Sequence, residues 1–295
     1  MKGIILAGGK GTRLYPLTQS VNKHLLPVYS KPMIFYPLSL LMMGDVRDIL
    51  IISNECDIPY FKQVLGDGEN YGIRIQYAVQ DKPSGLPEAF IIGEDFIGDD
   101  DVILMLGDNL LFGDIEFYKS ALKVQNDKNS GIHGQIFGYF VSNPESYGVV
   151  EFDLKSQKVL SLEEKPKVPK SNYAIPGIYI FDSTVVEKAK KVRPSKRNET
   201  EIIDVIKEYW LEDSLRVEII TRGVAWMDMG TPKRLLEASN YVQSIEDRQG
   251  LNIASLEEIA LRKKFITREE FKRSVALLPA SSYKDYLINY DKFFA

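Results

Sequence analysis

The stretch that decides the fold is KGIILAGGKGTRLYPLTQSVNKHLLP, residues 2–27. It opens with the apolar run 3–7 and continues into the glycine-rich segment 8–13, which carries basic residues. An apolar run without polar alternation is typical of a strand buried on both faces, as in a parallel sheet. The loop after such a strand lies at the carboxyl edge, where open α/β sheets bind ligands. The stretch therefore predicts a strand, a glycine loop and a basic arm at a ligand crevice.

The chemistry of this loop favours a phosphate ligand. Glycines take positive φ, so that successive backbone N–H groups can converge on an anion. An arginine adds a planar fork of donors, and a lysine adds a compact charge. For a lone glycine pair, the alternative interpretation is an ordinary glycine turn with solvent-exposed charges. We expect the triphosphate of a nucleotide to meet Gly8, Gly9, Gly11, Thr12 and Arg13, with Arg13 and Lys23 as the catalytic cations.

Two commoner phosphate loops do not fit the segment. The P-loop ends in Gly-Lys-Ser/Thr, whereas here Lys10 precedes Gly11 and no such triplet follows. A G-x-G-x-x-G fingerprint that begins at Gly9 would need its third glycine at Leu14. An NAD-binding oxidoreductase is therefore disfavoured, and a cofactor titration would test it.

The whole string is similar to the signature of the sugar-nucleotide pyrophosphorylases, a nucleotidyltransferase family. Its members carry L-A-G-G-x-G-T-R-L and then a Lys just before L-L-P-V; Asn22 stands where they often have Pro. The resemblance implies an α/β enzyme that transfers a nucleotidyl group, and it points to the members that use dTTP and glucose 1-phosphate. A UTP-using sister enzyme and a non-catalytic regulatory sugar-nucleotide-binding protein of the same fold stay open.

Composition limits the other classes of function. The chain has 295 residues, a net charge of -4, one cysteine (Cys56) and two histidines (His24 and His133). We expect no nucleic-acid partner and no membrane partner, because nothing suggests a broad basic surface and no apolar run approaches the ~20 residues that span a bilayer. One cysteine is too few for a multi-cysteine zinc site, and two histidines leave little from which to build a Ser-His-Asp triad. The start passes directly into a strand, so we expect a cytoplasmic enzyme.

The residue pattern predicts a doubly wound, mostly parallel, Rossmann-like α/β sheet, then a mixed β section and a C-terminal helical appendage. Strands are expected in the first half at 48–52, 73–79 and 101–106, with helices at 32–43, 59–65 and 85–92. In the second half, strands are expected at 133–141, 147–152, 159–163 and 173–181, helices at 185–191 and 200–210, and a return to the sheet at 217–221 and 225–228. Four helices should follow, at 232–244, 255–263, 267–277 and 283–290, with capping boxes that begin at Ser255 and Thr267.

The expected organisation is one nucleotidyltransferase domain, 1–240, followed by an appendage, 241–295. Within the domain, about 1–130 would bind the nucleotide and about 131–231 the sugar phosphate. No repeat, low-complexity segment or clear linker divides the chain.

Two carboxylates follow apolar runs at predicted strand ends, Asp108 in ILMLGDNLL and Asp228 in VAWMDMGT. Mg²⁺ usually takes one or two carboxylates together with substrate phosphates. Each residue alone would equally suit a turn or a helix cap. The resemblance implies that both are ligands of the metal, Mg²⁺; Met229 stands where the family often has Thr.

Gln80 and Gly85 flank the loop DKPS after a predicted strand. An amide offers a donor and an acceptor to a pyrimidine edge, and a glycine permits close approach of a flat base. A polar strand end and a turn glycine are the ordinary alternative. The resemblance implies contacts with the nucleobase, although the family's loop reads P-S-P-D.

The sugar side rests mainly on the resemblance. By default, the charges in SLEEKP would be a solvated surface run. The resemblance implies that Glu164 binds sugar hydroxyls and that Tyr147-Gly148 touch the sugar. It also implies that the sugar phosphate is met by Lys23, Lys165 and Arg197; Asn198 replaces a Gly that usually follows the arginine. It also implies a homotetramer inhibited by dTDP-L-rhamnose at a separate site.

Overall fold

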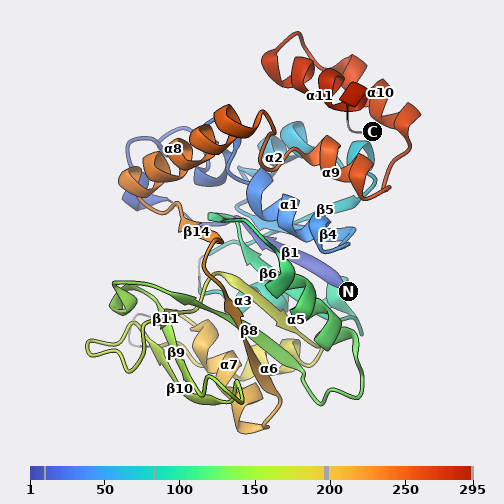
Figure 1. Cartoon of the computed structure of the whole chain (residues 1–295). Coiled ribbons are helices and arrows are strands. Elements are labelled where there is room, and N and C mark those ends of the chain that lie inside the picture. Colours follow the sequence, from blue (N-terminus) through green and yellow to red (C-terminus); the bar gives the residue numbers. More distant parts are fainter. Residues whose placement is uncertain (10, 83, 196–198, 294–295) are drawn as a thin grey trace.

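The computed structural model describes residues 1–9, 11–82, 84–195 and 199–293, so the predicted site residue Arg197 lies outside the described residues. The strands of the main sheet are β1 (Lys2–Leu6), β4 (Asp48–Ser53), β5 (Arg74–Val79), β6 (Val102–Leu106), β8 (Gly134–Phe140), β9 (Gly148–Phe152), β10 (Val159–Glu164), β11 (Tyr173–Ala174), β12 (Ile178–Phe181) and β13 (Leu215–Ile220). Over the described ranges these ten strands run in the order β10-β9-β11-β8-β12-β6-β1-β4-β5, with β13 paired to β8. Figure 1 shows the arrangement.

The centre of the sheet is parallel, as the sequence predicts. β1 pairs in parallel with β4 on one side and β6 on the other, and β4 pairs in parallel with β5. The carboxyl ends of these strands therefore meet at one edge, where a doubly wound sheet binds ligands.

Both faces of this centre are covered by helices, which makes the sheet doubly wound. The α-helices among the described residues up to 211 are α1 (Phe35–Met43), α2 (Ile58–Leu65), α3 (Glu88–Ile92), α4 (Glu94–Ile97), α5 (Glu116–Asn126), α6 (Val185–Lys191) and α7 (Ile202–Leu211). Ile5 packs into the cluster that contains α1 and α5, and Ile4 into the cluster that contains α3, α6 and α7. Each fully buried isoleucine side chain contributes about 1.5–3 kcal/mol, so the strand that starts the glycine loop is firmly held.

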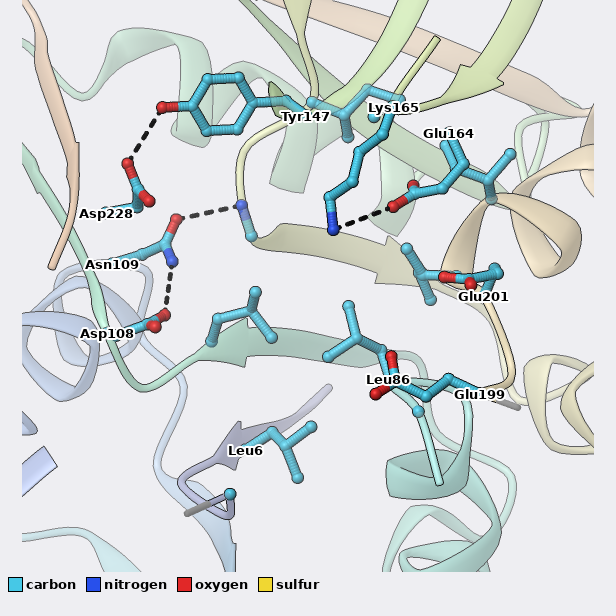
Figure 2. A pocket seen from close by; sticks show the side chains of 18 of the residues that line it. Leu6, Leu86, Asp108, Asn109, Tyr147, Glu164, Lys165, Glu199, Glu201 and Asp228 are labelled. Atoms are coloured by element: carbon cyan, nitrogen blue, oxygen red, sulfur yellow. Dashed lines mark hydrogen bonds and ion pairs between the residues drawn. The ribbon is translucent and has the colours of Figure 1, made fainter. Parts of the chain in front are cut away.

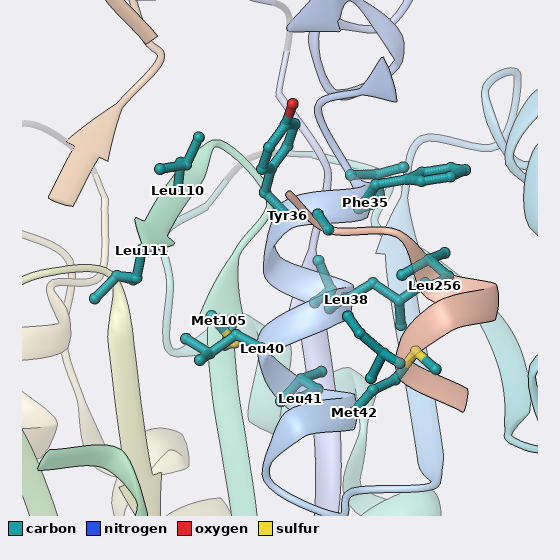
Figure 3. Close-up of a cluster of buried hydrophobic side chains, with 14 of the residues drawn as sticks. Phe35, Tyr36, Leu38, Leu40, Leu41, Met42, Met105, Leu110, Leu111 and Leu256 are labelled. Atoms are coloured by element: carbon teal, nitrogen blue, oxygen red, sulfur yellow. The ribbon is translucent and has the colours of Figure 1, made fainter. Parts of the chain in front are cut away.

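Helix α1 shows why the sequence around it is apolar on every side. All its residues from Phe35 to Met42 are buried. Figure 3 shows its side chains meeting Met105 of β6, Leu111 and, from the far end of the chain, Leu256. A helix buried all round needs no polar face, and this one fixes β1 and β6 against the C-terminal helices.

The second half of the sheet is mixed, as predicted, but one strand differs. β12 runs antiparallel to β6 and β8, and β9 runs antiparallel to β10. The prediction of one strand over 173–181 is wrong, because β11 and β12 are separate strands. Pro176 between them has no N–H for the ladder. A Cβ on Gly177 would lie 2.5 Å from Leu106, so the chain passes close to the end of β6.

The predicted return of 225–228 to the main sheet is also wrong. Strand β14 (Ala225–Asp228) pairs antiparallel with β7 (Asn109–Phe112) in a separate two-stranded sheet. β7, which the sequence reading did not predict, follows β6 after the two residues Gly107 and Asp108. The short sheet brings Asp228 into register with Asn109, next to Asp108.

The C-terminal helices are α8 (Pro232–Gln249), α9 (Leu256–Arg262), α10 (Arg268–Leu277) and α11 (Ser282–Phe293). Figure 1 shows α10 and α11 at the end of the molecule opposite β9 and β10. The capping box at Thr267 is confirmed; the one at Ser255 is wrong, because the Ser255 hydroxyl lies 3.2 Å from the hydroxyl of Tyr283 and makes no cap hydrogen bond. α8 runs through residue 240, and the division into 1–240 and 241–295 stays a prediction. Among the described residues, no helix has both the length and the apolar character that crossing a membrane would require.

Candidate active site

A cleft of about 670 Å³ opens at the carboxyl ends of β1 and β6, where Leu6 and Leu106 line it. Its lining residues come from segments spread between Leu6 and Arg234, and Figure 2 shows part of this lining. The predicted site residues that line it are Gly8, Gly9, Arg13, Gln80, Gly85, Asp108, Tyr147, Gly148, Glu164, Lys165 and Asp228. The cleft thus brings together predicted residues that lie up to 220 positions apart in the sequence, from Gly8 to Asp228.

The glycine loop divides into a part at the cleft and a part behind it. Gly9 has φ 94° and open space where a Cβ would stand, so its backbone is free to approach a ligand. Gly11, at φ 57°, turns the chain instead, because a Cβ there would lie 2.8 Å from the methyl group of Thr18. Thr12 begins a short 3-10 helix. Neither Gly11 nor Thr12 is among the described residues that line the cleft.

Gln80 is buried and held in one orientation at the end of β5. Its amide N–H donates to Oε2 of Glu88 in α3 at 2.6 Å. A Cβ on Gly8 would lie 2.5 Å from the amide oxygen of Gln80, so only glycine leaves room there. Because one N–H of the amide is engaged by a carboxylate, the orientation of the amide is fixed and its oxygen is available for a ligand. Gly85, on the same side, forms a parallel bridge with Thr200.

Asp108 is held as an anion by groups from distant parts of the chain. The Lys23 Nζ lies 2.7 Å from its Oδ2, and the Asn109 amide donates to its Oδ1 at 3.0 Å. Burial alone raises the pKa of Asp108, but Lys23, His24 and the hydrogen bonds outweigh it, so the pKa falls well below its usual value. Lys23 itself is not among the described lining residues and reaches the cleft only through Asp108.

His24 does not supply a base. Burial, with Lys23 as a second cause, lowers the pKa of His24 to about 3, so the ring is neutral near pH 7. Its Nδ1 lies 2.8 Å from Oδ1 of Asn22. His133 lies elsewhere, 3.1 Å from Asp182. Among the described lining residues of the cleft, none is a histidine.

Asp228 lies across from Asp108 and has a different surrounding. The hydroxyl of Tyr147 donates to Oδ1 at 3.1 Å, and the guanidinium of Arg234 pairs with Oδ2. Burial raises the pKa of Asp228 and outweighs the opposite effects of Arg234 and Tyr147. Arg234 carries no sequence signal of its own that points to this site. Its position could have been found only by seeing that Thr231-Pro232 starts a helix directly after the strand.

Arg13 connects the glycine loop with the end of β14. A Cβ on Gly230 would lie 3.0 Å from Nη2 of Arg13 and 3.4 Å from its Cζ. The guanidinium therefore lies against the Gly230 backbone, two residues after Asp228. This contact places the guanidinium of Arg13 beside the segment that follows β14.

The opposite wall carries the predicted sugar-side residues. Gly148 pairs with Glu164 in the β9–β10 ladder, and Lys165 follows at φ 44°. The Lys165 Nζ lies 3.5 Å from Oε1 of Glu164, and Figure 2 shows both side chains over the cleft. The same view shows Glu199 and Glu201, which the sequence analysis did not single out.

The donor set fits a hard divalent cation that is completed by substrate. Among the described residues, no group of three or more His, Cys, Asp or Glu side chains could hold a metal ion. Asp108 and Asp228 are nevertheless neighbours, since the Met229 N–H donates to the Asp108 carbonyl at 2.9 Å. Two carboxylates without a third ligand suit a cation that takes its remaining oxygens from substrate phosphates and water.

Known proteins resemble the chain over almost its whole length. A family model described as nucleotidyl transferase matches residues 2–245. A Neisseria gonorrhoeae protein named glucose-1-phosphate thymidylyltransferase is 50% identical over 98% of this chain and 99% of its own. A Mycolicibacterium smegmatis protein of the same name is 49% identical over 98% of each chain. A Bacillus anthracis crystal structure, assigned as a glucose-1-phosphate thymidylyltransferase in complex with a sucrose, is 38% identical, with a TM-score of 0.74 over 82% of this chain and 94% of that one.

Proposed function

The chain belongs to the nucleotidyl transferase family, and from that premise we propose that it transfers a thymidylyl group from dTTP to α-D-glucose 1-phosphate, releasing pyrophosphate. The products are dTDP-glucose and pyrophosphate. The observation that carries the proposal is one cleft in which a glycine loop, two carboxylates and the Glu164–Lys165 pair all converge. The relatives named glucose-1-phosphate thymidylyltransferase support the choice of substrates.

The nucleotide would lie on the side of the cleft formed by the glycine loop. Gly8, Gly9 and Arg13, which line the cleft, would meet the triphosphate, and we extend this role to Gly11 and Thr12 of the same loop. The Gln80 oxygen would accept the N3–H of thymine, and Gly85 would let the base lie flat against the backbone. Support comes from the hydrogen bond to Glu88, which fixes the orientation of the amide and leaves its oxygen available.

The sugar phosphate would lie on the opposite side. Glu164 would accept hydrogen bonds from sugar hydroxyls, and the backbone of Gly148 beside Tyr147 would contact the ring. Lys165 and Lys23 would balance the charge of the phosphate, and we extend this role to Arg197. The position of Lys165 at the cleft supports its assignment, whereas Lys23 is paired with Asp108, so its role toward the phosphate rests on the family signature.

Asp108 and Asp228 would hold the metal, which we propose to be Mg²⁺. When bound, it supplies positive charge that stabilises the phosphate oxygens of substrate and leaving group. Support comes from two neighbouring carboxylates at a strand edge, the donor set that Mg²⁺ takes together with phosphates.

The reaction needs little acid–base chemistry from the protein. The second pKa of a phosphate monoester is about 6, so the attacking sugar-phosphate oxygen is already anionic near pH 7. A buried, neutral His24 is consistent with that. Arg13, Lys23 and Lys165 bring two anions together for in-line attack on the α-phosphorus. Positioning of this kind can supply about 7–11 kcal/mol of the barrier.

The test is a product assay with dTTP, UTP and CTP against glucose 1-phosphate, read as kcat/KM from pyrophosphate release. Thymine and uracil both carry an N3–H for Gln80, whereas cytosine has an acceptor there. We expect dTTP to be used best and CTP at least about 100-fold worse. Preference for UTP over dTTP would make the chain the UTP-using sister enzyme. Lack of turnover with every nucleotide would leave the non-catalytic alternative.

We also propose that the enzyme acts in the cytoplasm as a homotetramer and that dTDP-L-rhamnose inhibits it at a separate site. Leu236 on α8 and Leu277 on α10 are exposed and would suit an interface between copies. Light scattering of the full chain measures the assembly. Inhibition by dTDP-L-rhamnose that persists at saturating dTTP would support the separate site, and purely competitive inhibition would contradict it.

A further inference from the structure

Arg234 has a place in the cleft that the proposed reaction leaves unexplained. It is the third residue of α8, and its guanidinium pairs with Oδ2 of Asp228. The same guanidinium lies over the ring of Tyr147, 5.5 Å from the centroid. Because the Tyr147 hydroxyl donates to Oδ1, both oxygens of the Asp228 carboxylate have partners.

The formal charges of the two carboxylates are already balanced. Lys23 pairs with Asp108 and Arg234 with Asp228, which gives two negative and two positive groups. A divalent cation at the two carboxylates would therefore face two cations at short range. Like charges at such a distance repel, so at least one of the two side chains has to withdraw.

Of the two cations, Arg234 is the one with room to leave. Its side chain is 28% exposed, against 17% for Lys23. A second cavity of about 470 Å³ adjoins the cleft and is lined by Arg234, Tyr147 and Glu237. Glu237, three residues along α8, offers a carboxylate on that side. The guanidinium can thus withdraw from Asp228 by rotation of its own side chain.

The helix itself does not favour a cation at this position. The amino end of an α-helix carries partial positive charge, and the first turn of α8 contains Lys233 and Arg234 but no acidic residue. The backbone is fixed, because Thr231 caps the helix by accepting from the Arg234 N–H at 3.4 Å. The guanidinium is therefore held in place by Asp228 and by the ring of Tyr147, not by the helix.

We propose that Arg234 is a positioning residue that takes the place of the metal at Asp228 in the free enzyme and must release that carboxylate before it can coordinate a divalent cation. The proposal rests on the proposed function, because it takes Asp108 and Asp228 as the metal ligands. In the free enzyme, Arg234 then competes with the metal for Asp228.

The test is Mn²⁺ binding to the full-length protein, followed by the loss of the electron paramagnetic resonance signal of free Mn²⁺. Arg234→Met is compared with Lys233→Met, which removes the same charge from the next residue, 85% exposed and paired with Glu237 at 3.8 Å. We expect Arg234→Met to bind Mn²⁺ about three- to tenfold more tightly than the wild type, and Lys233→Met to bind it as the wild type does. Arg234→Lys should fall between, because a lysine keeps the charge but loses the planar fork.

The same variants are then compared by the Mg²⁺ concentration that gives half-maximal rate, which should fall in Arg234→Met. Circular dichroism confirms that each variant is folded. Equal values for Arg234→Met and Lys233→Met in both measurements would overturn the proposal, as would weaker metal binding in Arg234→Met. Asp228→Asn separates the two levels: if it binds Mn²⁺ as the wild type does, the proposed metal site itself is wrong.

Discussion

Asp108 and Asp228 stand at two sides of one cleft, and the chain builds their surroundings in opposite ways. Asp108 ends the parallel centre of the sheet, is 13% exposed and pairs with Lys23, 85 residues away. Asp228 ends a two-stranded sheet, is 21% exposed and pairs with Arg234, six residues away. The pKa of Asp108 is lowered, whereas that of Asp228 is raised.

The two carboxylates therefore differ in how firmly their partners are held. Asp108 has two neighbouring donors, Lys23 and Asn109, that favour its charged form. Asp228 depends on a partly exposed arginine and on a tyrosine hydroxyl. We infer that Asp108 prepares the site before substrate arrives, and that the Asp228 side is the part that rearranges.

The largest expected effect is on turnover. Asp108→Asn and Asp228→Asn each remove one negative oxygen donor from the proposed metal site, and we expect kcat to fall about 100- to 1,000-fold in each. Initial rates of pyrophosphate release measure this, with unchanged circular dichroism as the control for folding. Near-normal rates in either variant would remove that residue from the site.

A second expected effect is on stability, and here the two sides should differ. Lys23→Met leaves a buried carboxylate without its cation, which typically costs about 3–5 kcal/mol. Arg234→Met acts on a more exposed pair and should cost about 1 kcal/mol or less. Urea unfolding of the metal-free proteins measures both. Equal losses would mean that the two carboxylates are equally dependent on their partners, and the contrast would fail.

The smallest expected effect is on the pH dependence of stability, where the signs are opposite. The lowered pKa of Asp108 gives stability that is present above pH 3.8, its ordinary value, and is lost as the pH falls through the folded value. The raised pKa of Asp228 gives stability that is present below pH 3.8 and is lost as the pH rises through the folded value.

Asp108→Asn should therefore flatten the loss of stability in acid, and Asp228→Asn should steepen it. Unfolding midpoints are compared from about pH 6 down to about pH 2, so that the measurement covers the range below pH 3.8 in which Asp108 acts. His24, with its pKa lowered to about 3, adds a loss of stability between pH 6.5 and 3. This loss cancels between the wild type and Asp228→Asn, but Asp108→Asn changes it because Asp108 raises the pKa of His24, so the Asp108→Asn slopes are compared below pH 3. Slopes that change in the same direction would contradict the assignment.

Local patterns explain why much of the fold could be predicted. The run 3–7 has apolar side chains for both faces, and the structure buries Ile4 and Ile5 on opposite sides of β1. Apolar runs that lead into Gly-Asp and into Met-Asp-Met-Gly indicated that Asp108 and Asp228 would lie at strand ends. Such signals need only a few neighbouring residues.

The predictions that failed needed tertiary information. Residues 225–228 form a strand as expected. Their partner, however, is not the main sheet but β7, the strand that begins after the turn at Gly107 and Asp108. Ser255 has the sequence of a capping residue, yet the packing of α11 brings Tyr283 to its hydroxyl instead. Arg234 reads as a helix-surface cation until the strand end before the helix puts Asp228 within its reach.

The most direct measurement of the central claim is the anomalous scattering of Mn²⁺ in crystals of the full chain grown with dTDP-glucose. The account predicts a Mn²⁺ ion bound by both Asp108 and Asp228, with the Arg234 guanidinium withdrawn from Asp228. A Mn²⁺ ion that leaves Asp228 paired with Arg234, or that binds away from both carboxylates, would contradict it.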